Sequence, residues 1–167
     1  MSKVDLVSLK TAIKTALDAN NVEGASPFFD ISTGMTKRVK RVLTVNPENI
    51  KPLANNLPAI CVYVLNKRPQ PKSIGPNQTT VKRQGKIIIQ IAGIVWNANY
   101  LSNKENDPAD SDLEHLMENI EELLRNYPQI DGVKWQFPTD VTYHAASFDE
   151  ETHLRVGFLD LELTAFY

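Results

Sequence analysis

Hydrophobic residues recur at steps of three and four near the start of the chain, with polar residues between them. Such spacing is typical of an amphipathic helix, because side chains three and four residues apart share one face. The pattern therefore predicts one helix of about four turns that ends near the pair Asn20 and Asn21. Its apolar face consists of Leu6, Leu9, Ile13, Ala16 and Leu17.

The middle of the chain contains segments in which apolar residues alternate or run together, as they do in strands. Residues 28–31 predict a short strand after a loop at residues 24–27, and residues 37–45 predict a half-exposed strand. Residues 58–65 form a continuous β-branched and aromatic run, which is typical of a strand buried on both faces. Residues 81–96 have the longest strand pattern, so we expect the centre of this strand in the middle of a sheet.

A basic segment with many turn-forming residues separates these last two strands. Residues 68–80 contain three prolines and a glycine and have little apolar content. Such segments usually run over the protein surface, so the sequence predicts an exposed loop here.

A second helix is predicted where apolar residues again recur at helical spacing. An aspartate followed by Pro108 supplies a cap and a first-turn proline, and Ser111 with Glu114 has the spacing of a capping box. Asn126 and Pro128 are expected to end the helix. The apolar stripe between these signals consists of Leu113, Leu116, Met117, Ile120, Leu123 and Leu124.

The end of the chain predicts a β-hairpin made of residues 139–147 and 153–167. A turn centred near residue 149 would place Arg155 opposite His144. In the second strand the apolar residues occupy even positions before Gly157 and odd positions after it. We therefore expect a β-bulge near this glycine, which would reset the alternation.

These elements define the expected fold class, which is α+β. We predict a mainly antiparallel sheet of four to six strands with two principal helices packed on one of its faces. The length of 167 residues is typical of one domain and sufficient to bury a sizeable core. Residues 1–167 are therefore expected to form a single domain.

Composition narrows the class of protein without indicating a ligand. Hydrophobic residues make up 42% of the chain, charged residues make up 23%, and the net charge of -2 gives no overall attraction to nucleic acid or anionic membrane. Cys61 is the only cysteine, which excludes an intramolecular disulfide and a cysteine-based metal cluster. We also expect no secretory signal, no membrane span and synthesis in the cytoplasm.

Candidate chemistry is sparse among the histidines and glycines. His115 is followed by a leucine where a zinc-protease helix motif requires glutamate, and the hairpin register keeps His144 and His153 from facing each other. Gly85 and Lys86 lack the remaining residues of a phosphate-binding loop. These residues therefore predict neither a metal site nor a nucleotide site.

The acidic pair Asp160 and Glu162 shares one face of the last predicted strand. Paired carboxylates can perform acid–base chemistry, but on an alternating strand they usually form its solvated side. We therefore expect that the protein is not an enzyme and that it has no catalytic, cofactor-binding or metal-ligating residues.

Charge is distributed unevenly along the chain. Residues 37–86 contain eleven basic residues and one acidic residue, a net charge of +10, whereas residues 105–125 contain eight acidic residues and one basic residue, a net charge of -7. Opposite charges on separate surfaces can join copies head to tail, and the chain of contacts closes into a ring where the rotation allows it. We predict a subunit interface that includes Lys37, Arg38, Lys40, Arg41, Lys82, Arg83, Asp110, Asp112, Glu114, Glu118 and Glu121.

Two other interpretations of these charges stay open. Both segments can be ordinary solvated faces, or the basic one can approach DNA phosphates. Tyr63 is the only aromatic residue in the basic segment, which disfavours the binding of single strands by base stacking.

The order of the predicted elements resembles that of the tail-terminator (tail-completion) proteins of long-tailed bacteriophages. The resemblance rests on the amphipathic helix at the start of the chain and on the strand entered through residues 57–63. It also rests on the basic loop that leads into residues 83–91, and on the acidic helix at residues 111–116 with the closing hairpin. Together these stretches cover most of the chain from Leu57 onward.

This resemblance implies a hexameric ring in the virion, at the head–tail junction. The ring would cap the tail tube, stop its polymerisation and offer a surface to the head-side connector. The implied partners are further copies of the chain, the tail tube protein and a connector or neck protein, with passive contact to DNA in the lumen as a further option. The family has no catalytic signature, so no cofactor is implied.

Two alternatives remain beside this interpretation. A neck or head-completion protein would have a similar role in the same assembly. A nucleic-acid-binding module of ferredoxin-like type would also combine helices with a basic sheet, but it would show exposed aromatic residues on its central strands. The longest strand pattern has Ile87, Ile88 and Ile89 at these positions instead.

Overall fold

The computed structural model of this protein describes residues 5–23, 30–50, 54–70, 84–97, 108–126, 129–130, 133–134, 141–147 and 153–166. Several expected features lie outside these residues. They are the loop at residues 24–27, the first part of the strand expected at residues 28–31, most of the loop expected at residues 68–80, and the hairpin turn near residue 149.

The described chain contains two α-helices, two short 3-10 helices and seven strands. The helices are α1 (Leu6–Ala19), η1 (Pro47–Asn49), η2 (Ala54–Asn56) and α2 (Pro108–Asn126). The strands are β1 (Arg41–Leu43), β2 (Ala59–Gln70), β3 (Gln84–Asn97), β4 (Gln129–Ile130), β5 (Val133–Lys134), β6 (Val141–Ser147) and β7 (His153–Phe166).

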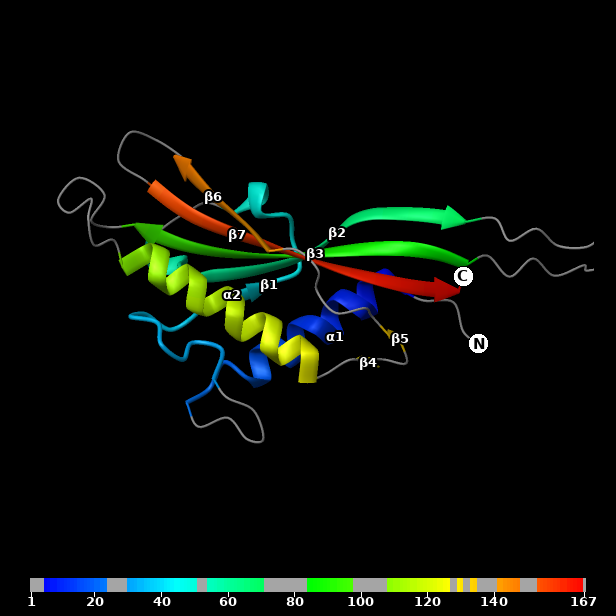
Figure 1. Cartoon of the computed structure of the whole chain (residues 1–167), viewed down its shortest axis with the longest axis horizontal. Helices are drawn as coiled ribbons and strands as arrows, with labels where there is room; N and C mark the ends of the chain where they lie inside the picture. Colours follow the sequence, from blue (N-terminus) through cyan, green and yellow to red (C-terminus); the bar gives the residue numbers. More distant parts are fainter. Residues whose placement is uncertain are drawn as a thin grey trace, which may run out of the picture.

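Five of the strands form one sheet in the order β1-β2-β3-β7-β6, and β4 and β5 form a separate two-stranded pair. All neighbours in the large sheet are antiparallel except β1 and β2, which are parallel. Both helices lie on the same side of this sheet (Figure 1). The expected α+β class with two helices on a mostly antiparallel sheet is therefore confirmed, and β3 is its central strand as predicted.

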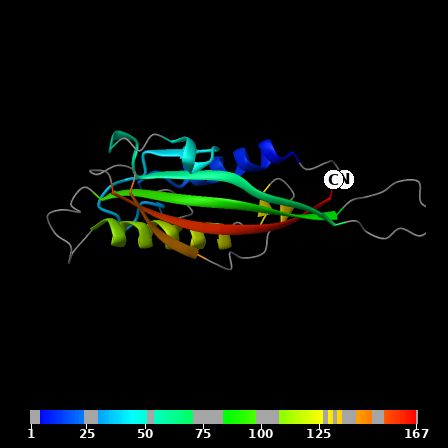
Figure 2. The same ribbon diagram turned by 90° about the horizontal axis from the view of Figure 1, so that it is seen from above.

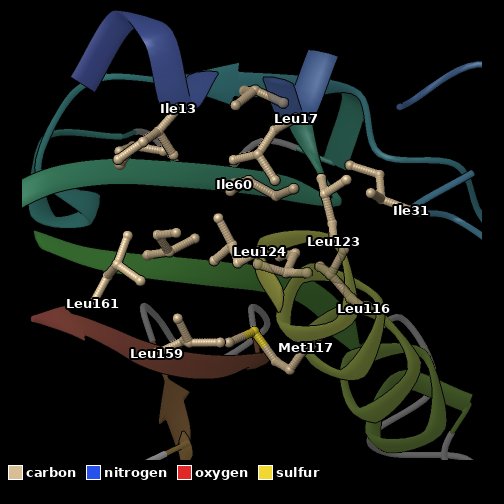
Figure 3. Packing of buried hydrophobic residues seen from close by; sticks show 14 of the residues in the cluster. Ile13, Leu17, Ile31, Ile60, Leu116, Met117, Leu123, Leu124, Leu159 and Leu161 are labelled. Carbon is tan, nitrogen blue, oxygen red and sulfur yellow. The ribbon is translucent and has the colours of Figure 1, made fainter. Parts of the chain in front are cut away.

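The main hydrophobic core lies between the two helices and the sheet (Figure 3). Helix α1 contributes Leu9, Ile13 and Leu17, and α2 contributes the whole apolar stripe predicted for it. The strands complete this core with alternate residues, such as Ile89 of β3 and Leu161 of β7. Truncation of one such side chain to alanine typically costs about 2–5 kcal/mol.

Helix α1 begins and ends where the sequence predicts. The carboxylate of Asp5 accepts hydrogen bonds from the backbone N–H groups of Val7 and Ser8, at 3.1 and 3.3 Å, so it caps two of the amides that a helix start leaves unpaired. At the other end Asn20 is buried, and its side-chain amide donates to the carbonyl of Ala16 at 2.8 Å. These polar contacts fix both ends of the helix.

Helix α2 starts at Pro108 and ends at Asn126, as expected. The predicted capping box is wrong, because Ser111 and Glu114 lie within the helix rather than at its start. Proline at the first helical position is sufficient to begin a helix there, since its fixed φ angle suits the first turn and its missing N–H would be unpaired in any case.

The strand expected at residues 37–45 is shorter than predicted and covers only β1. Its buried residue is Val42, whereas Val45, which was expected on the apolar side, is 41% exposed. The backbone N–H of Lys40 donates to the carbonyl of Pro58, so pairing with β2 begins only at this point. Ile31, expected in a short strand, lies buried in a turn instead.

Strand β2 continues beyond the end that the sequence predicts. Residues 68–70 were assigned to the exposed loop, but they pair with β3 through Gln70. The strand has a bulge between Val64 and Asn66, where its pairing with β3 shifts by one residue. Together with the matching parts of β3 and β7, the second half of β2 extends to the right in Figure 1.

The β-bulge predicted near Gly157 is absent, because the pairing of β7 with β3 and with β6 runs through this glycine without a shift. The apolar alternation changes phase for another reason. The outer face of the sheet, away from the helices, carries a second apolar cluster at this end, and Leu154 and Val156 belong to it. Leu159, Leu161 and Leu163 of β7 instead face the main core.

The hairpin register is also displaced by one residue from the prediction. His144 lies opposite Val156, and Arg155 lies opposite Ala145. His153 lies opposite Ser147, so the two histidines do not face each other in this register either.

Two glycines of adjacent strands form a close contact with helix α2. Gly93 of β3 lies directly opposite Gly157 of β7. A Cβ atom at Gly93 would lie 2.8 Å from the sulfur of Met117, and one at Gly157 would lie 2.7 Å from its Cγ atom. The absence of both side chains therefore makes room for the methionine, whose side chain Figure 3 shows pointing from α2 toward the sheet.

Candidate interaction surfaces

Four acidic residues form one stripe along helix α2. Asp110, Glu114, Glu118 and Glu121 follow each other at steps of four, four and three residues, which places them on one flank of the helix. Arg155 of β7 forms an ion pair with Asp110 at the start of the stripe. We call these four residues the acidic stripe.

Tyr143 of strand β6 places the acidic stripe beside the edge of the sheet. Its pKa is raised from the ordinary value of 10.0 mainly by partial burial, and then by the negative charges of Glu114, Glu118 and Glu121. Tyr143 nevertheless remains 49% exposed. The stripe and Tyr143 therefore form one surface, with Arg125 paired to Glu121 at its far end.

Asp112 lies on the opposite flank of α2 and is only 3% exposed. Its carboxylate accepts hydrogen bonds from the backbone N–H of Thr36 at 2.7 Å and from the hydroxyl of the same residue. Asp112 was predicted to lie in a subunit interface, but in this fold its charge is engaged inside the chain.

The same inner flank of α2 binds the segment that precedes β1. The side-chain amide of Asn119 donates to the carbonyls of Ile31 and Thr33, both at 2.9 Å. Gly34 has a φ angle of 82°, and a Cβ atom there would lie 3.1 Å from the His115 ring. Polar side chains of α2 therefore hold residues 31–36 against the helix, a role that the sequence analysis did not find.

The basic residues of the predicted interface are not all equivalent. Lys37, Lys40 and Arg41 are exposed in or just before β1. Arg38 is partly buried and forms an ion pair with Asp30 at 2.5 Å. The other two predicted basic residues, Lys82 and Arg83, lie outside the described residues.

The exposed basic residues and the acidic stripe lie toward opposite sides of the sheet. Strands β1 and β6 are its two edges, and Lys40 and Arg41 belong to the β1 edge. Helix α2 packs on β3 and β7, and its acidic stripe borders β6. Figure 2 shows α1 on the β2 side of the molecule and α2 on the side of β7 and β6.

The outer face of the sheet carries a row of polar residues where the second apolar cluster ends. Tyr63 donates a hydrogen bond to Gln90, whose amide donates to the carboxylate of Asp160 at 2.7 Å. Burial, followed by the charge of Asp160, raises the pKa of Tyr63 to about 12. One row further along, Lys86 pairs with Glu162 at 2.6 Å. Asp160 and Glu162 thus have partners on neighbouring strands.

The described residues hold little reactive chemistry. Burial raises the pKa of the Cys61 thiol to about 12, which leaves very little thiolate at neutral pH. Within the described ranges no group of three or more histidine, cysteine or acidic residues could hold a metal ion. Neither of the two described helices is long and apolar enough to cross a bilayer.

Comparison with known proteins adds no relative to this description. No protein-family model matches the chain, and no curated protein matches it either.

Proposed function

We propose that this chain is a structural assembly protein of a phage particle at the head–tail junction. Copies form a ring that caps the tail tube, ends its polymerisation and joins it to the head-side connector. The order of elements supports this proposal, since helix α1, the strands β2 and β3, helix α2 and the closing hairpin of β6 and β7 follow the arrangement on which the resemblance rests.

The separation of charge across the sheet is the observation that carries the proposal. One side presents Lys40 and Arg41, and the other presents the acidic stripe beside Tyr143. Two surfaces of opposite charge on one chain favour a heterologous contact, in which the basic side of one copy meets the acidic side of the next. Rotation about a common axis then closes the series of contacts into a ring.

A nucleic-acid-binding function has weaker support among the described residues. Tyr63, the aromatic residue of the basic segment, donates its hydroxyl to Gln90 within the polar row. Lys86, near the start of β3, forms an ion pair with Glu162. These contacts reduce the groups available for bases and phosphates on the outer face of the sheet.

Sedimentation velocity at low and high salt tests the proposal. We expect an oligomer of fixed size at low salt that dissociates as salt screens the charged contact. Lys40→Glu with Arg41→Glu should dissociate it, as should Glu114→Lys with Glu118→Lys. A chain that carries all four changes should assemble again, because both surfaces change sign together.

The control for this experiment is Glu122→Lys, which changes an exposed charge of the same helix outside the acidic stripe. This variant should assemble as the wild type does. Wild-type protein should also shorten the tubes formed by the tail tube protein of the same phage, and the dissociated variants should not. A monomer at every salt and protein concentration would contradict the proposal.

A further inference from the structure

The outer side of strand β6 is open in the described structure. β6 is the last strand of the large sheet, and its only strand partner among the described residues is β7. Thr142, Tyr143 and His144 in the strand are all exposed. An edge strand of this kind offers unpaired N–H and C=O groups, to which another strand can add.

A second open edge lies at the other side of the sheet. β1 pairs only with residues 59–61 of β2, so residues 62–68 of that strand have no described strand on their outer side. Leu65 is 50% exposed at the bulge within this part. Val45, which follows β1, is also among the exposed large hydrophobic residues. We call residues 62–68 the open half of β2.

The two open edges fit each other in length, charge and apolar surface. β6 has seven residues, and β2 continues from residue 62 to Gln70, so it is long enough to pair with the whole of β6. The open half of β2 carries the exposed basic residue Lys67, which lies opposite Ile87 and therefore on the helix side of the sheet, and the exposed apolar side chain of Leu65. On the same side of the sheet, β6 lies beside the acidic stripe and carries the exposed ring of Tyr143. The two edges therefore carry opposite charges, and each also offers an exposed apolar side chain.

We infer that β6 of one copy pairs with the open half of β2 of a second copy, so that the sheet continues from copy to copy. This inference rests on the proposed ring and specifies the contact that builds it. Three antiparallel steps separate β2 from β6 within one chain, so the two strands run in opposite directions. The registers place Val141 of β6 level with Val62, so β6 and the open half of β2 are offset along the strands, and a ring that joins them has its strands tilted to the ring axis, as in a barrel. Neighbouring copies in such a continued sheet keep these strand directions, and the joined strands are therefore antiparallel.

Cysteine cross-linking between two different variants tests this contact. Thr142 and His144 lie opposite Phe158 and Val156 on the outer face, and the register with β3 places Asn66 and Arg68 on the same face. In a continued sheet, cysteines at these positions come within disulfide distance of each other. The native Cys61 is fully buried and should not react.

We expect a covalent dimer when Thr142→Cys is mixed with Asn66→Cys or Arg68→Cys, and none when any of these variants is oxidised alone. When His144→Cys is used in place of Thr142→Cys, the β2 cysteine that cross-links most efficiently should have a lower residue number, because the strands are antiparallel. Ser111→Cys, an exposed position of α2 outside the acidic stripe, is the matched control and should form no dimer with the β2 variants.

Hydrogen exchange of the wild-type protein provides a measurement that needs no substitution. Backbone amides of β6 and of the open half of β2 should become protected together as the protein concentration rises. An oligomer with neither cross-links nor joint protection would overturn the strand pairing and leave the proposed function standing. Absence of any oligomer would instead reject the proposed function, and the strand pairing with it.

Discussion

The two flanks of helix α2 carry acidic residues with opposite roles. On the inner flank, Asp112 is buried and accepts two hydrogen bonds from Thr36. On the outer flank, Glu114 and Glu118 are exposed and form the middle of the acidic stripe. In the sequence these carboxylates belong to one acidic run, and only the fold divides them into a structural residue and surface charges.

The difference shows how a charged residue can stabilise a fold or label a surface, according to what packs beside it. A buried carboxylate must have its hydrogen-bond partners, because leaving a charge or an amide unpaired away from water is costly. Exposed carboxylates contribute little to stability, but they set which surfaces attract each other. Three predictions test this division.

The largest effect is expected from Asp112→Ala. This change leaves the N–H of Thr36 without its acceptor and removes two hydrogen bonds to a charged group, so we expect a loss of about 3 kcal/mol in the free energy of unfolding. Urea denaturation measures this loss. Asp112→Asn keeps an acceptor and should lose less.

Glu114→Ala is the matched control, because it removes a carboxylate from the outer flank of the same helix. We expect its free energy of unfolding to change by less than about 0.5 kcal/mol. Equal losses for Asp112→Ala and Glu114→Ala would show that the two flanks do not differ as described.

A smaller effect is expected from Gly34→Ala, within the segment that the inner flank holds. A side chain at a φ angle of 82° is strained, and its Cβ atom would lie 3.1 Å from the His115 ring. We expect a loss of about 1–2 kcal/mol from the backbone alone. A double-mutant cycle with His115→Ala separates the steric contribution from the backbone one, and an unchanged stability of Gly34→Ala would contradict the geometry.

The smallest effect concerns Tyr143 and the outer flank. Replacing both carboxylates by Glu114→Gln with Glu118→Gln removes negative charges that oppose the phenolate, so the pKa of Tyr143 should fall toward 10.0. NMR titration of labelled tyrosine measures it, with Tyr143→Phe as the assignment. Asp112→Asn should leave this pKa unchanged, because Asp112 is not among the charges that raise it.

The same titration has a consequence for stability. A tyrosine whose pKa is raised by folding stays protonated in the folded state at a pH where the unfolded chain has begun to lose the proton. Its contribution to stability is therefore present below pH 10 and is lost as the pH rises above this value. The double glutamine variant should lose less stability over this range than the wild type.

Much of the fold could be predicted because its helices and central strand are periodic. The spacing of Leu9, Ile13 and Leu17 indicates α1, and the alternation around Ile89 indicates β3. The end of β2 was missed because Pro69 is normally a sign of a loop. Proline is tolerated in strands that have no partner on one side, and this part of β2 has none among the described strands.

The face of the sheet to which each residue of β7 points was harder to predict than the strand itself. The change of alternation at Gly157 suggested a bulge, because the prediction assumed that only one face of β7 is buried. The second apolar cluster buries the other face near Val156, which a single strand pattern cannot distinguish from a shift in register.

The candidate surfaces were predicted only in part. The sequence indicates opposite charges on two segments, but Arg38 pairs with Asp30, and Asp112 bonds to Thr36 across a separation of 76 residues. Neither contact follows a local spacing rule, so composition overestimated the charge that reaches the surface. Tyr143 could not be assigned to the acidic stripe before the sheet order was known.

The contact of Met117 with Gly93 and Gly157 fixes the position of helix α2 along the strands. Side chains occupy the neighbouring positions on the helix-facing side of β3, at Ile91 and Val95, so α2 cannot slide along the sheet without driving its methionine into them. The helix is thereby restricted to one position along the strands. Glu114 and Glu118 lie within one turn of Met117 on the same helix. They are therefore held at a fixed position beside β6, and every copy presents them at the same place.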